Sequence, residues 1–87
     1  MLNDVGAEVY QTWSYEQRHE EIGKLVQGFR NGLPIEFLCL MATSIAGSES
    51  LAKEHLTALI PSKERQAIVA AAQGDRKARS RIKSFFI

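Results

Sequence analysis

The chain has 87 residues, 45% of them hydrophobic and 24% charged, and a formal net charge of +1 at pH 7. This length and composition predict one small folded domain, residues 1–87, and exclude an intrinsically disordered chain. A single cysteine, Cys39, excludes an intrachain disulfide, and the longest nearly uncharged stretch, residues 37–48, is too short for a membrane span, which needs ~20 residues. We therefore expect a cytoplasmic domain without a membrane span.

Charge is divided unevenly along the chain. Residues 61–87 contain seven Lys or Arg against two Asp or Glu, a net +5, whereas residues 1–60 contain four against eight, a net −4. Because the summed field of a protein steers its association, this asymmetry indicates charged partners, although it carries no information about chemistry.

The first strong helix signal lies at residues 14–17. This segment matches a capping box, in which Ser14 caps the helix and Gln17 reaches back to the Ser14 backbone. Gly32 predicts a left-handed helix end. Between these signals, apolar residues recur at helical spacing on one stripe: Ile22, Leu25, Val26 and Phe29.

A second helix is expected between Pro34, which suits a first helical position, and Gly47. Its apolar residues surround most of the helical wheel: Ile35, Phe37, Leu38, Leu40, Met41 and Ile45. A helix that is apolar all round is normally buried. The pattern therefore predicts a central helix with Leu40 in the core.

Two shorter helices are expected on either side of Pro61. Ser48 or Ser50 can cap the third helix, and Ser62 can cap the fourth. The predicted inner face of the third helix is aliphatic: Leu51, Ala52, Leu56, Leu59 and Ile60. The predicted inner face of the fourth is small and buries little area: Ala67, Ile68, Ala71 and Ala72.

Residues 75–87 are predicted to form a basic C-terminal helix, capped by Asp75. Its apolar stripe comprises Ala78, Ile82, Phe85 and Phe86. Residues 1–13 fit either a short helix or a loosely ordered segment, and no segment alternates apolar and polar residues as a strand does. The expected fold is all-α, a compact bundle of four to five short antiparallel helices whose short loops make consecutive helices neighbours.

The basic C-terminal helix is the first candidate site. Five cations flank its apolar stripe: Arg76, Lys77, Arg79, Arg81 and Lys83. They are predicted to bind an anionic partner, which is nucleic acid, an acidic protein surface or an anionic membrane. The alternative is a solvated face whose long side chains cover the apolar stripe.

An aromatic group is the second candidate site. Tyr10, Trp13 and Tyr15 lie within six residues, and aromatic side chains with a polar tip are enriched in protein interfaces. The alternative is that Trp13 fastens the N-terminal segment to the bundle.

No motif indicates catalysis, a metal or a cofactor. His19 and His55 stand outside any zinc-binding or protease spacing, and we expect both at the surface or its boundary. Cys39 lies within an apolar run, where a thiol normally packs as a small hydrophobe. We therefore predict a protein that is not an enzyme and has no catalytic residues, metal or cofactor.

Opposite charges and an aromatic group, without a chemical motif, favour a small regulatory or adaptor protein. Such a protein acts by binding another macromolecule, either a protein partner or a second copy of itself. The alternative is a nucleic-acid-binding protein whose basic C-terminal helix contacts the phosphate backbone.

Overall fold

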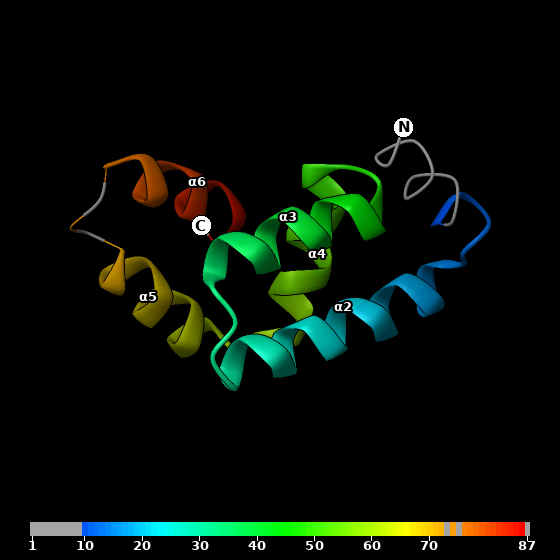
Figure 1. Ribbon diagram of the computed structural model, residues 1–87, viewed down its shortest axis with the longest axis horizontal. Helices are drawn as coiled ribbons and strands as arrows, with labels where there is room; N and C mark the ends of the chain where they lie inside the picture. The colour runs from blue at the N-terminus through cyan, green and yellow to red at the C-terminus, as the bar shows by residue number, and fades with distance from the viewer. Residues whose placement is uncertain (1–9, 73, 75, 87) are drawn as a thin grey trace.

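The computed structural model describes residues 10–72, 74 and 76–86, and within the last helix the side chains of residues 80 and 82–86. The described residues form helices and no strand, in the order α2 (Tyr15–Arg30), α3 (Ile35–Ala46), α4 (Glu49–Leu59), α5 (Ser62–Ala71) and α6 (Arg76–Phe86). The all-α bundle expected from the sequence is confirmed (Figure 1). The predictions for residues 1–9 and for Asp75 as a cap lie outside the described residues.

The start of α2 is the predicted capping box. The Ser14 side chain accepts a hydrogen bond from the Gln17 backbone N–H at 3.2 Å, and the Gln17 Oε1 accepts one from the Ser14 N–H at 2.8 Å. Two of the N–H groups that a helix start leaves unpaired are thereby satisfied.

The end of α2 is a Schellman turn. The Gly32 N–H donates to the Phe29 carbonyl and the Leu33 N–H donates to the Gly28 carbonyl, both at 3.0 Å. Gly32 has a φ of 121°, which a residue without a Cβ adopts freely. The turn reverses the chain and delivers it to α3.

The starts of α3 and α5 differ from the prediction by one residue. Pro34 and Pro61 are the N-caps, so that Ile35 and Ser62 are the first helical residues. In α4, the Ser48 side chain accepts a hydrogen bond from the Leu51 N–H at 3.2 Å, which identifies Ser48 as the cap rather than Ser50.

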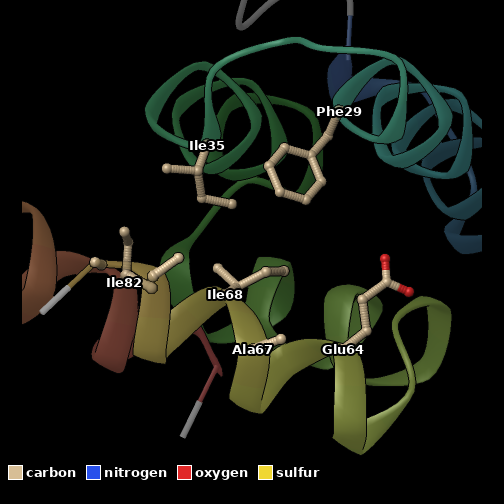
Figure 2. Close-up of a pocket in the computed structure, with 8 residues that line it drawn as sticks. Phe29, Ile35, Glu64, Ala67, Ile68 and Ile82 are labelled. Atoms are coloured by element: carbon tan, nitrogen blue, oxygen red, sulfur yellow. The ribbon is translucent and has the colours of Figure 1, made fainter.

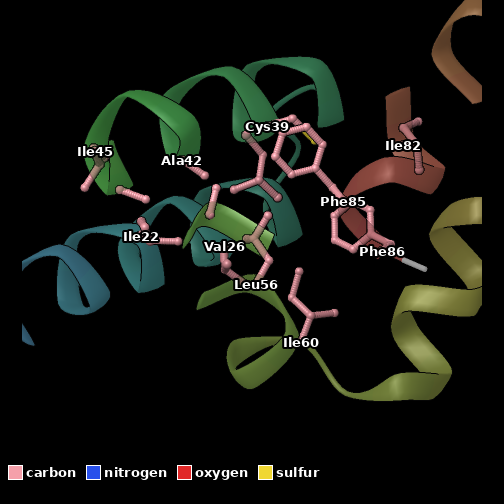
Figure 3. Packing of buried hydrophobic residues seen from close by; sticks show 13 residues of the cluster. Ile22, Val26, Cys39, Ala42, Ile45, Leu56, Ile60, Ile82, Phe85 and Phe86 are labelled. Carbon is pink, nitrogen blue, oxygen red and sulfur yellow. The ribbon is translucent and has the colours of Figure 1, made fainter. Parts of the chain in front are cut away.

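The core is built by α2, α3, α4 and α6 (Figure 3). Its largest apolar members come from all four helices and the residue that follows α4: Ile22, Val26, Leu38, Ile45, Leu56, Ile60, Ile82, Phe85 and Phe86. The phenyl rings of α6 lie among the aliphatic side chains of the other helices, so the last helix is anchored through its apolar stripe.

Three predicted core positions are wrong. Leu40 is 63% exposed, Phe37 is 43% exposed and Leu51 is 40% exposed. Helix α3 packs on α2, α4 and α6 through one face only, because so few short helices cannot surround any member. An all-round apolar wheel therefore leaves a stripe of α3 in solvent.

Helix α5 contributes no buried residue to the core, although Ile68 and Val69 pack partly buried against it. The chain direction changes by 115° between α3 and α4, so this pair crosses steeply. Helix α4 packs on α3, α6 and α2 but hardly on α5, so the expectation that consecutive helices are neighbours is wrong for α4 and α5. Helix α5 packs chiefly on α6, and the two lie together at one end of the molecule (Figure 1). No residue of α5 is fully buried, which leaves a gap beside it.

Candidate functional site

An apolar groove runs between α5 and the rest of the bundle. It has a volume of about 510 Å³ and is lined by seven apolar side chains and one carboxyl: Phe29, Ile35, Ala67, Ile68, Ala71, Ala72, Ile82 and Glu64. Figure 2 shows Phe29 and Ile35 on one wall, opposite Ala67 and Ile68 of α5. The size lies within the range of ordinary ligand-binding clefts, roughly 300–1,000 Å³.

The small residues of α5 explain why the groove stays open. The sequence predicts that the alanine-rich face of α5 points inward, and it does point toward the bundle, but Ala67 and Ala71 remain exposed. Ile68 is half-buried. A methyl group reaches too short a distance to close the gap between two helices, so the face lines a groove rather than the core.

An ion pair closes one end of the groove. Arg30 at the end of α2 donates two hydrogen bonds to Glu64 of α5, Nε to Oε2 and Nη2 to Oε1, both at 3.0 Å. This bidentate contact holds the pKa of Glu64 below its usual value and raises the pKa of Arg30. The carboxyl that lines the groove is therefore already neutralised from within the chain.

A histidine pair joins α2 to α4 outside the groove. The Nδ1 atoms of His19 and His55 lie 2.7 Å apart, and His55 is only 1% exposed. Tyr15, one turn before His19, stacks on the His55 ring with 4.4 Å between centroids. The expectation of surface or boundary histidines is wrong for His55, because the packing of α4 on α2 seals its ring under Tyr15.

The environment of His55 opposes its positive charge. Burial lowers the pKa of His55 and the neighbouring His19 lowers it further, while Glu54 acts in the opposite direction and Arg18 adds to the lowering. The described residues contain no group of three His, Cys, Asp or Glu that could hold a metal ion. The contact between the two rings is a hydrogen bond between their Nδ1 atoms.

The aromatic group of the sequence divides into two parts. Tyr10 and Trp13 form an edge-to-face pair, with 4.8 Å between ring centroids, and both pack partly buried against the core. Tyr15 is 51% exposed and turns instead to the histidines. The three residues therefore do not form one patch, and their role in an interface stays a prediction.

The predicted cationic site is described only in part. Lys83 is exposed, whereas the side chains of Arg76, Lys77, Arg79 and Arg81 lie outside the described residues. The rings of Phe85 and Phe86 are buried in the core and are not available to stack on bases. Binding of an anionic partner by this helix stays a prediction.

The structure buries Cys39 in the core and gives the lengths of the apolar helices. Cys39 is 1% exposed and packs in the core, as expected for its position in an apolar run. Within the described ranges no single helix is long and apolar enough to cross a membrane, although α3 and α4 together, bent by 115°, pass on length and composition.

No protein family, curated protein or solved structure matches the chain. The groove and the histidine pair were both missed at the level of sequence. The alanine-rich face of α5 is the signal from which a groove could have been expected, whereas no spacing in the sequence pairs His19 with His55.

Proposed function

We propose that this protein is a small non-enzymatic adaptor that binds a partner protein by accepting an apolar helix of that partner in the groove beside α5. One observation carries the proposal. Helix α5 has no fully buried residue, yet it presents Ala67, Ile68 and Ala71 to an apolar groove of about 510 Å³. An apolar face that the described part of its own chain leaves uncovered is typical of a site that a partner covers.

The shape and composition of the groove favour a helix as the occupant. Ala67 and Ala71 are one helical turn apart and exposed, so a second helix can approach α5 closely along its length. Amphipathic helices bind such grooves through side chains spaced three, four and seven residues apart. The pairing of Glu64 with Arg30 removes the need for a charge on the partner at this end.

A partner in the groove also contributes stability. A chain of 87 residues buries only about 60–65% of its unfolded surface, and a ligand that binds the folded state alone shifts the folding equilibrium toward it. Closing the groove would bury the half-exposed Ile68 and the methyl groups of α5, which adds to the core.

The proposal is tested by crosslinking from two neighbouring positions of α5. A photoreactive amino acid is placed at position 67, inside the groove, or at position 70, where Ala70 is exposed but does not line it. In a nuclease-treated lysate of the source organism, we expect the photoreactive group at position 67 to form a crosslink to a protein partner. The crosslinked site on that partner should lie in an amphipathic segment. Position 70 should link that partner far less.

Binding of the identified partner is then measured with purified proteins by titration calorimetry. Ala67→Trp fills the groove without removing a buried group, and we expect it to weaken binding at least tenfold, while Ala70→Trp binds as the parent does. Equal crosslinking from both positions, or an unchanged affinity of the Ala67→Trp protein, would contradict the proposal. A partner that is lost on nuclease treatment and binds with a steep salt dependence would instead support the nucleic-acid alternative through the basic helix.

A further inference from the structure

We propose that His19 and His55 form an acid-sensitive latch that holds the first half of α2 on α4 and opens when both rings become protonated. The inference stands on the geometry of the pair and is independent of the groove. The 2.7 Å between the two Nδ1 atoms permits one proton between them and no more. One ring must donate an N–H and the other must accept it through a lone pair.

The number of protons decides whether the latch can stay closed. With both rings neutral, one carries its proton on Nδ1 and the other on Nε2, so the hydrogen bond forms. With one ring charged, the imidazolium donates to the neutral ring and the bond becomes charge-assisted. With both rings charged, two N–H groups face each other at a distance where neither can accept, and the contact cannot exist.

The groups around the histidine pair determine whether a positive charge on His55 is favoured or opposed. From α2, Tyr15 stacks on His55 and His19 is hydrogen-bonded to it, while Arg18 of α2 and Glu54 of α4 act on it electrostatically. Helices α3 and α6 also pack on α4, and their described buried side chains are apolar apart from the Cys39 thiol. Burial, His19 and Arg18 oppose a charge on His55, and the exposed Glu54 favours it.

The stability of the closed latch therefore falls with acidification. The pKa of His55 is lowered in the folded chain, whereas an unfolded histidine titrates near 6.5. Stability is fully present above about pH 6.5 and is lost as the pH falls toward the lowered value. Each extra proton bound by the open state shifts the opening equilibrium about tenfold per pH unit. His19 and His55 are the only histidines in the chain, so no other imidazole can produce this response.

Nitrogen-15 NMR of the imidazole rings tests the pair in the unaltered chain. At pH 7.5 we expect one ring protonated on Nδ1 and the other on Nε2, and on acidification two coupled titration steps. Independent titration of both rings near pH 6.5, with α2 still closed on α4, would overturn the proposal.

Hydrogen exchange tests the opening itself. Between pH 6 and 5, and after correction for intrinsic rates, we expect backbone exchange to rise about tenfold in residues 18–22 and little in residues 26–30. In His19→Asn, the amide at the Nδ1 position can either donate or accept, so it can pair with both charge states of His55. This variant should show a clearly weaker acid response than the parent, because only the effect of burial on His55 remains, while its exchange at pH 7.5 stays low. An acid response in His19→Asn equal to that of the parent would refute the latch.

Discussion

Arg18 of α2 contacts Ala46, the last residue of α3, which lies 28 residues further along the chain. Its Nη1 donates a hydrogen bond to the Ala46 carbonyl at 2.8 Å, and its Nη2 donates one to the Tyr10 carbonyl at 2.7 Å. A cation is favourable at a helix C-terminus, where the carbonyls lack intrahelical donors. One side chain of α2 therefore fixes both the end of α3 and the segment that precedes α2.

Removing this guanidinium should destabilise the protein. We expect Arg18→Met to lower the free energy of unfolding by on the order of 2–3 kcal/mol, because it removes two charge-assisted hydrogen bonds and takes from the Ala46 carbonyl its side-chain donor, while the Tyr10 carbonyl keeps the Trp13 N–H. Arg18→Lys should be intermediate, since one ammonium group replaces a planar fork that reaches both carbonyls. Urea unfolding measures both variants, and an unchanged midpoint for Arg18→Met would contradict this role.

The two leucines Leu40 and Leu56 should respond very differently to truncation. Leu56→Ala removes a fully buried side chain of α4 and should cost about 2–5 kcal/mol of stability, through lost burial and a residual cavity. Leu40→Ala removes a side chain that is 63% exposed and should change stability by less than about 1 kcal/mol. Thermal or urea unfolding decides between this result and the core position that the helical wheel of α3 predicts. Similar losses in the two variants would contradict the structure.

Two glycines should respond to alanine with opposite signs. Gly23 lies within α2, where an added Cβ meets only Leu59 at an ordinary 3.7 Å, so Gly23→Ala should stabilise the protein by up to about 1 kcal/mol. Gly47 has a φ of 97°, and an added Cβ would lie 3.3 Å from Arg18 Nη1. Gly47→Ala should therefore destabilise by about 1–2 kcal/mol. The difference in unfolding midpoint measures the contrast, and a stabilising Gly47→Ala would refute it.

The ion pair between Arg30 and Glu64 should lose its effect in acid. Because Arg30 lowers the pKa of Glu64, the stabilisation is present above the unfolded pKa of about 4.3 and is lost as the pH falls through the lower folded value. A double-mutant cycle with Arg30→Met and Glu64→Gln should show favourable coupling at pH 7 that vanishes at pH 2 and weakens at 1 M salt. Coupling that stays constant with pH would show that the contact is not ionic.

The sequence by itself determined the local structure of this protein. The Ser14 capping box, the Gly32 turn and the 3.6-residue stripes depend on neighbours within a few residues, so the helices and most of their ends could be predicted from them. The buried faces of α2 and α6 followed for the same reason, since each helix has one clear apolar stripe.

Only the tertiary structure decided which apolar faces stay uncovered and which distant residues meet. The wheel of α3 is apolar on nearly every side, so no periodicity could tell that Leu40 faces solvent. His19 and His55 are 36 residues apart, and only the packing of α2 on α4 brings their Nδ1 atoms together. The groove beside α5 likewise depends on the angle between helices, because alanine methyls close a gap only where backbones approach closely.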